Sequence, residues 1–97
     1  MRTLLRARLD TEAASAAIQN GRVEAILGEL MSKAKPEAAY FFDDQGKRCA
    51  SIVFDLRDSS EIPGLVEPLF QELKAEVQLI PVMNLDDLQK GLSVLGK

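Results

Sequence analysis

The residue types best suited to chemistry lie at alternating positions near the start of the chain. Arg2, Arg6 and Arg8 are separated by even intervals within the segment Arg2 to Leu9. Successive side chains of a strand point to opposite faces, so one face of a strand here would carry all three guanidinium groups. Guanidinium groups bind carboxylates with two parallel hydrogen bonds, and they also bind carbonyl oxygens. Arg6 and Arg8 are therefore candidates for holding a small organic ligand.

Further polar side chains complete the expected ligand site. Tyr40 and Ser51 offer hydroxyl donors, and Asp55 or Glu67 offers a carboxylate that can act as a base. A structural ion pair inside a dimer explains the arginines equally well, because arginine and carboxylate pairs are common at interfaces. Both interpretations stay open, and no catalytic residue is assigned. The expected ligand-binding residues are Arg6, Arg8, Tyr40, Ser51, Asp55 and Glu67.

Several kinds of site are excluded by the residues that the chain lacks. Histidine is absent, and Cys49 is the only cysteine. These counts exclude Ser-His and Cys-His nucleophile pairs, an intramolecular disulfide and the usual zinc ligand sets. The acidic pairs at 43–44 and 86–87 are typical of a turn and of a helix start. We expect no metal and no cofactor, so that any acid-base step would fall to carboxylates, lysine, tyrosine or water.

Length and charge limit the size of the protein and its partners. The chain has 97 residues, which predicts a single domain spanning 1–97. Twelve basic and fifteen acidic residues give a net charge of −3, which disfavours nucleic acid and anionic lipid as partners. No apolar run approaches the ~18 residues of a membrane span, and no apolar leader follows Met1. We expect a soluble cytoplasmic protein without a membrane partner.

Hydrophobic periodicity and turn residues predict the elements of the first half. After the strand Arg2 to Leu9, Asp10 or Thr11 is expected to cap a helix that Asn20-Gly21 interrupts and that ends before Pro36. Strands are then predicted over Glu37 to Asp43 and Lys47 to Leu56. The residues at 43–46 between them are typical of a tight hairpin turn.

The second half repeats the helix and strand pattern. Ser59 or Ser60 is expected to cap a helix whose first turn accommodates Pro63, whereas Pro68 should bend or split that helix. A strand follows over Val77 to Met83, and Pro81 favours an edge position. A short amphipathic helix is predicted over 85–95, with Asn84 as its cap.

The order strand, helix, strand, strand, helix, strand is that of a ferredoxin-like α+β fold. It predicts a four-stranded antiparallel sheet with both helices on one face and a short C-terminal helix. If the hairpin pairs Asp43 with Arg48, Tyr40 lies opposite Ser51 and Phe42 opposite Cys49. Phe41, Ala50, Ile52 and Phe54 then face the helices.

The open face of this predicted sheet is too apolar for a surface that meets only water. Leu4, Phe42, Val53, Ile80 and Val82 would form a contiguous patch, and such patches mark interfaces. We therefore expect a homodimer through the open face. Because the first and third strands are neighbours, Asp55 is the expected ion-pair partner of Arg6 or Arg8. The residues assigned to this face are Arg2, Leu4, Arg6, Arg8, Tyr40, Phe42, Cys49, Ser51, Val53, Asp55, Gln78, Ile80 and Val82.

The run from Cys49 to Met83 resembles part of a known superfamily. Its strand Ser51 to Asp55, helix Glu61 to Phe70 and strand Glu76 to Val82 are similar to the second half of muconolactone isomerases and their uncharacterised relatives, over about a third of the chain. The resemblance implies a dimeric α/β barrel with a pocket between sheet and helices for small hydrophobic or lactone-like molecules. Members that depend on histidine are excluded as models. Lys35 to Phe41 also resembles a family of short uncharacterised bacterial proteins.

Three functional hypotheses follow. The first is a dimeric protein that binds a small molecule between sheet and helices without catalysis. The second is a cofactor-free isomerase or lyase resembling muconolactone isomerase, and the third is a structural or partner-binding domain. A pocket would favour the first two, and a carboxylate with a raised pKa inside it would favour the enzyme. Whether the protein is an enzyme stays open.

Overall fold

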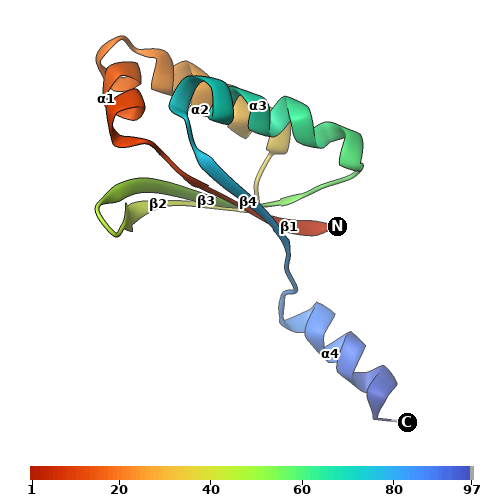
Figure 1. Ribbon diagram of the computed structural model, residues 1–97. Coiled ribbons are helices and arrows are strands. Elements are labelled where there is room, and N and C mark those ends of the chain that lie inside the picture. Colours follow the sequence, from red (N-terminus) through yellow and green to blue (C-terminus); the bar gives the residue numbers. More distant parts are fainter. Residues whose placement is uncertain (97) are drawn as a thin grey trace.

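One four-stranded antiparallel sheet carries helices on a single face (Figure 1). The computed structural model describes residues 1–96. Across the sheet the strand order is β2-β3-β1-β4, and each neighbouring pair is antiparallel. The elements are β1 (Arg2–Arg8), α1 (Thr11–Gln19), α2 (Arg22–Ala34), β2 (Ala38–Asp44), β3 (Lys47–Asp55), the 3-10 turn η1 (Ser59–Glu61), α3 (Ile62–Leu73), β4 (Glu76–Pro81) and α4 (Leu85–Leu95).

This architecture confirms the predicted α+β class. Over residues 1–96 the elements form four antiparallel strands in one open sheet with four α-helices, an arrangement compatible with a ferredoxin-like fold. The interruption predicted at Asn20-Gly21 divides the first helical region into α1 and α2. Gly21 adopts a left-handed conformation there, with φ +78°, which glycine tolerates because it has no Cβ. The dimeric α/β barrel stays a prediction.

The strand register agrees with the register predicted from the hairpin. Asp43 pairs with Arg48, Tyr40 with Ser51, and Phe42 with Cys49. The turn itself consists of Gln45 and Gly46, which both have positive φ, at +53° and +86°. Two central residues with positive φ are characteristic of a type I′ hairpin turn, whose twist matches that of the two strands.

The core lies between the sheet and the three helices α1, α2 and α3. Alternate residues of β1 are buried, as are Ile52 and Phe54 of β3. Leu69 and Leu73 of α3 pack against this face and are almost completely buried. Phe41 belongs to the helix-facing side by register, yet its side chain is 59% exposed. It lies on the edge strand β2, where the helices leave part of its ring uncovered.

Helix starts follow local capping chemistry, with one correction. Asp10 caps α1 as predicted, accepting a hydrogen bond from the backbone N–H of Ala13 at 2.9 Å. The predicted caps Ser59 and Ser60 are wrong, because Asp58 forms a capping box with Glu61 and η1 precedes α3. Aspartate is as good a cap as serine, and the reciprocal hydrogen bonds with Glu61 satisfy two backbone donors.

Pro68 does not split α3. The helix runs without interruption from Ile62 to Leu73, with Pro68 inside it. Proline lacks an N–H and therefore leaves the carbonyl of Gly64 without that intrahelical partner. Leu65 and Leu69, on either side of the proline, are both buried in the core. Packing of both halves against the sheet keeps the helix in one piece.

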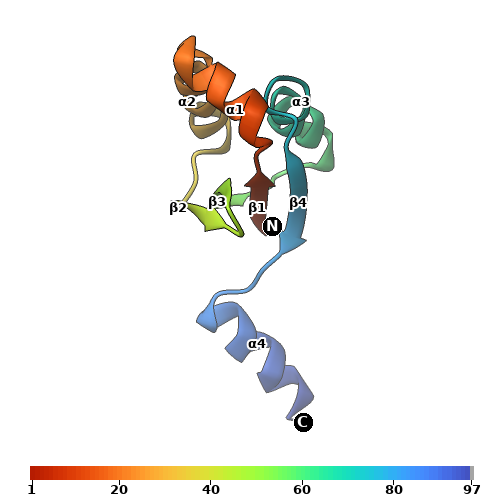
Figure 2. The ribbon, with the colours of Figure 1, turned by 60° about the vertical axis from the view of Figure 1, so that its left-hand side comes forward.

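The C-terminal helix α4 stands apart from the two-layer body. It extends away from the sheet on the side opposite α1, α2 and α3 (Figures 1 and 2). Asn84 caps it as predicted, in a capping box with Asp87. None of its described residues is buried. An ion pair of 2.6 Å between Arg2 and Asp87 joins its first turn to β1.

Candidate functional site

The predicted arginine face exists on the open side of the sheet. Arg6 lies between Ser51 of β3 and Gln78 of β4 in the strand register, and Ser51 in turn lies opposite Tyr40 of β2. Residues opposite one another in a sheet share a face. The guanidinium of Arg6 and the hydroxyl groups of Ser51 and Tyr40 therefore occupy one row across the open face.

Asp44, at the end of β2, is the carboxylate that pairs with these arginines. One of its oxygens lies 2.7 Å from a guanidinium nitrogen of Arg6 and 3.5 Å from Nε of Arg8. Arg8 also contacts Glu76 of β4 at 3.3 Å. The guanidinium carbon of Arg6 lies 5.9 Å from the ring centroid of Phe42, close enough for a cation–π attraction.

The prediction that Asp55 pairs with Arg6 or Arg8 is wrong within the chain. Asp55 lies opposite Arg2, at the other end of the sheet, and accepts a hydrogen bond of 2.6 Å from the amino group of Met1. That bond and the charge of the amine hold the pKa of Asp55 below its ordinary value. Strands 1 and 3 are neighbours as expected, but their antiparallel register separates Asp55 from Arg6 by four residues of β1.

Cys49 is buried although it belongs to the open face. Its register partners are Arg8 on one side and Phe42 on the other, and 3% of its surface is exposed. Arg6 and Arg8 reach from β1 to Asp44 over the strand that contains Cys49. The thiol therefore behaves as the small buried apolar group that its residue type favours.

A polar hollow of about 280 Å³ borders the arginines. It is lined by Arg6, Arg8, Glu76 and Gln78. Glu67 does not contribute to it, because it lies on the exposed side of α3 and accepts a hydrogen bond from Gln71 at 3.0 Å. The open face therefore gathers Arg6, Arg8, Tyr40 and Ser51, whereas Asp55 lies at its far end and Glu67 lies on the helix side.

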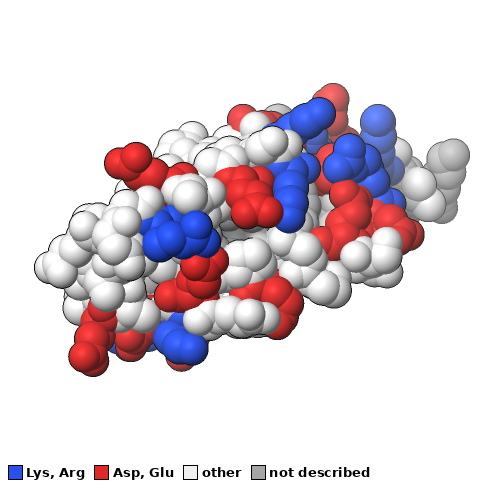
Figure 3. All heavy atoms as spheres, turned by 90° about the horizontal axis from the view of Figure 1, so that it is seen from above, with Lys and Arg blue, Asp and Glu red and all other residues white. Residues whose placement is uncertain are grey.

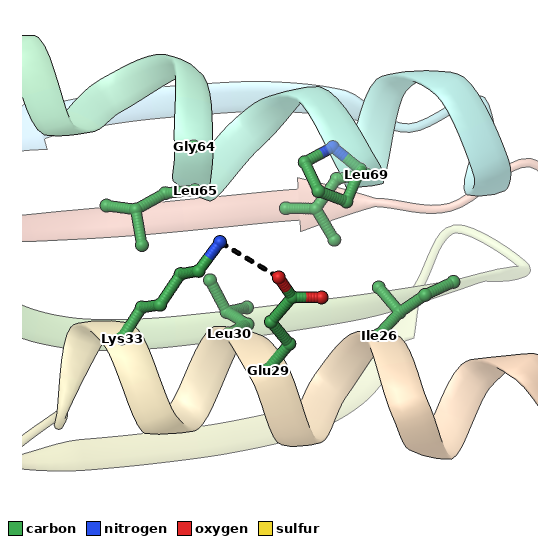
Figure 4. Close-up of a pocket in the computed structure, with 8 residues that line it drawn as sticks. Ile26, Glu29, Leu30, Lys33, Gly64, Leu65 and Leu69 are labelled. Carbon is green, nitrogen blue, oxygen red and sulfur yellow. Dashed lines mark ion pairs between the residues drawn. The ribbon is translucent and has the colours of Figure 1, made fainter.

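Pro68 borders no ligand-sized space. The crevice beside it, between α2 and α3, has a volume of about 10 Å³. Figure 4 shows Glu29 and Lys33 extending from α2 toward α3 and joined by an ion pair, which measures 2.9 Å. This pair holds the pKa of Glu29 below its ordinary value. A volume of this size accommodates at most one water molecule.

The larger apolar cavity lies on the other side of the sheet, beneath α1 and α2. It has a volume of about 270 Å³. Ala7 of β1 and Ala50 of β3 form its floor, and Arg48 is the charged residue that borders it. Its apolar walls include Leu9, Ile18, Val23, Leu27, Phe41 and Leu69.

The site prediction did not include the residues of this cavity. The signal available in the sequence was Ala50, which the predicted hairpin register places opposite Phe41 on the helix-facing side, together with Ala7 on the apolar side of the first strand. Phe41, Ala50 and Ala7 form one row across three strands. A methyl side chain fills little of the space between sheet and helices, so two adjacent alanines leave a gap that the larger helix residues do not close.

Local hydrogen bonds and ion pairs favour the charged form of several carboxyl groups in the described part of the chain. Each carboxyl group with a shifted pKa, namely those of Glu29, Asp55, Asp58, Glu61 and Asp87, has its pKa lowered. Basic and acidic side chains alternate over the helix-bearing side (Figure 3). Residues 1–96 contain no cluster of three His, Cys, Asp or Glu side chains able to hold a metal ion. None of the helices described is both long and apolar enough to cross a membrane.

Comparison with known proteins adds no assignment. No protein-family model matches the chain, and no curated protein matches it. The resemblance to muconolactone isomerases therefore has no support beyond the small α+β fold with its four-stranded antiparallel sheet.

Proposed function

We propose that this protein binds a small apolar molecule without transforming it, in the cavity between the sheet and helices α1 and α2. The observation that supports the proposal is the cavity of about 270 Å³, whose walls are apolar apart from Arg48. Ligand sites are typically concave, mostly apolar and provided with few polar groups. The volume is close to the lower bound of such sites, about 300 Å³.

The cavity selects for a compact ligand with one polar end. A volume of this size equals roughly that of nine water molecules in the liquid, which corresponds to about ten non-hydrogen atoms. Two residues that line the cavity are partly exposed to solvent, namely Phe41 (59% exposed) and Ile18 (47% exposed). A bound ligand would cover both side chains. Arg48, whose guanidinium contacts Ser15 Oγ at 3.2 Å, would meet a carbonyl or carboxylate at the rim.

The homodimer belongs to the same proposal. The open face carries Leu4, Val53 and Ile80 in one row across β3, β1 and β4. Ile80 is 40% exposed, and Leu4 and Val53 are half-buried. Contiguous apolar surface of this kind on a small domain is typical of an interface. The dimer would use the sheet face opposite the cavity, so that ligand binding and association involve separate surfaces.

A cavity-filling variant tests the binding proposal. Ala50→Leu places three more carbon atoms on the cavity floor, whereas Ala25→Leu makes the same change at an exposed position of α2. The probe is indole, whose nine non-hydrogen atoms fit the cavity and whose emission shifts to shorter wavelength in an apolar site; the chain itself contains no tryptophan. We expect enhancement of this short-wavelength fluorescence with the wild type and with Ala25→Leu. The enhancement should fall at least about tenfold with Ala50→Leu if the variant remains folded by circular dichroism. Equal enhancement in all three proteins would refute the proposed site.

The cofactor-free isomerase or lyase is the second candidate, and the polar hollow at Arg6 and Arg8 favours it. Two guanidinium groups there would orient a lactone or carboxylate. Deuterium uptake next to the carbonyl of a simple unsaturated lactone, followed by NMR in D₂O, tests for proton transfer. Catalysed exchange that disappears in Arg6→Gln and persists in Arg22→Gln would favour the enzyme over the binding protein.

A further inference from the structure

Helix α4 presents an apolar stripe that nothing in the described chain covers. Leu85, Leu88, Leu92 and Leu95 recur at intervals of three and four residues, which places them on one side of the helix. Their exposed fractions are 68%, 39%, 53% and 80%. An isolated helix of this length is marginal in water, because few hydrogen bonds offset the entropy of nucleation. A packing partner is therefore needed to keep α4 folded.

The open face of the sheet provides a second uncovered apolar surface on the same molecule. Val53, Leu4 and Ile80 cross three strands as one row, and Val82 follows Ile80 toward α4. A helix of eleven residues is about 16 Å long. Three neighbouring strands span about 10 Å between the first and the third, and β1 extends over about 20 Å. The open face around this row is therefore long enough and wide enough to accommodate α4.

The position of α4 directs its stripe toward another molecule. Figures 1 and 2 both show α4 extending away from its own sheet. The ion pair between Arg2 and Asp87, 2.6 Å long, and the capping box of Asn84 fix the first turn of the helix beside the end of the sheet. Only the short segment 82–84 separates β4 from this turn.

We infer that α4 of each chain packs on the open sheet face of a second copy of the same chain, in a reciprocal exchange. The inference rests on the proposed homodimer and specifies what covers the open face. The covering element is helix α4 of the other copy, not the sheet of the other copy. In a dimer with twofold symmetry, each copy would place its α4 on the partner and would receive the partner's α4 on its own open face. Both apolar surfaces of the chain would then be buried together.

The area available agrees with a stable dimer. Full burial of one leucine removes on the order of 100 Å² of apolar surface from water, so the exposed parts of the four leucines contribute roughly 240 Å² per helix. Two helices and two equal sheet areas beneath them would together bury about 960 Å², close to the roughly 1,000 Å² that a specific interface reaches. A lipid surface is the less suitable partner, because Asp86 and Asp87 begin the helix and Lys90 is the basic residue in its described part.

The test compares two neighbouring positions of α4 in the full chain. Leu92→Glu adds a carboxylate to the apolar stripe, and Ser93→Glu adds one on another side of the helix. Sedimentation velocity should give a dimer for the wild type and for Ser93→Glu. Because the contact occurs twice in each dimer and an unpaired carboxylate is costly to bury, Leu92→Glu should weaken dimerisation by about 100-fold or more.

A mixing experiment distinguishes helix exchange from direct packing of two sheets. Ile80→Glu damages the open face and should also give a monomer. Leu92→Glu retains an intact open face and Ile80→Glu retains an intact α4, so an equimolar mixture should form a heterodimer with one intact contact. Circular dichroism of each variant checks that the body remains folded.

Two results would overturn the exchange. If Leu92→Glu remains a dimer while Ile80→Glu dissociates, the protein is a homodimer whose two sheets pack directly on each other. In that case α4 does not cover the open face. A wild-type protein that is monomeric at high micromolar concentration would overturn both the exchange and the homodimer. Neither result bears on the apolar cavity, because that site lies on the opposite side of the sheet and is tested with the fluorescent probe.

Discussion

Arg6 and Asp44 form an ion pair of 2.7 Å between strands that are not neighbours. Arg6 belongs to β1 and Asp44 to β2, and β3 lies between them. The side chains of the pair are 35% and 23% exposed, so they cross the open face partly shielded from water. This pair, shared with Arg8 at 3.5 Å, joins one edge strand to the centre of the sheet independently of the backbone hydrogen bonds.

Replacing Asp44 should therefore destabilise the sheet. Asp44→Asn removes the negative charge that attracts both Arg6 and Arg8 and offsets the repulsion between them. We expect the free energy of unfolding to fall by about 1 kcal/mol. Asp86→Asn is the control, because Asp86 is exposed on α4 and has no ion pair within residues 1–96. Urea unfolding followed by circular dichroism measures both. Equal stability of the two variants would mean that solvent screens the Arg6 pair completely.

Two glycines should respond in opposite directions to alanine. Gly46 has φ +86° in the hairpin turn, so Gly46→Ala strains the backbone and should lower stability by about 1 kcal/mol. Gly28 lies inside α2, where an added Cβ would meet no atom within 4 Å. Gly28→Ala should raise stability by about 0.5–1 kcal/mol. Thermal unfolding should therefore separate the two midpoints by several degrees, with the wild type between them.

The two prolines of α3 provide a second contrast. Pro68→Ala supplies the missing N–H to the carbonyl of Gly64 within a continuous helix, and we expect stability to rise by about 1 kcal/mol. Pro63 lies in the first turn, where no intrahelical partner is lost, so Pro63→Ala should leave stability unchanged or slightly lower it. Chemical denaturation measures the difference. A loss of stability in Pro68→Ala would show that the proline ring contributes more through packing than it costs in hydrogen bonding.

Acid should weaken the attachment of α4 to the sheet. The carboxylate of Asp87 accepts a hydrogen bond from the backbone N–H of Asn84 and pairs with Arg2, and both hold its pKa below the ordinary value of 3.8. A lowered pKa in the folded state gives stability that is present above pH 3.8 and is lost as the pH falls through the folded value. The amide signal of Asn84 in NMR should therefore shift below about pH 4. Asp87→Asn should abolish this shift, whereas Asp86→Asn should retain it.

Local pattern was sufficient to predict the elements and the register of the hairpin between β2 and β3. The alternation of Arg2 to Leu9 identifies a strand with one apolar face, because the side-chain period of a strand is two residues. Asn20-Gly21 marks the division between α1 and α2, and the hairpin residues place Tyr40 opposite Ser51, because both depend on backbone conformations over a few residues. Asp10 and Asn84 were predictable as caps for the same reason.

Only the tertiary structure decided which groups meet across these elements. Asp44, not Asp55, reaches Arg6, because the antiparallel register places Asp55 at the far end of β1. The apolar cavity depends on volumes that six separate elements leave unfilled around Ala7 and Ala50, which no single segment specifies. The sequence by itself determined the strands, the helices and their amphipathic faces through short-range periodicity and backbone preference. Pairing partners, cavities and the exposed position of α4 depend on distances between segments far apart in the chain, and packing sets those distances.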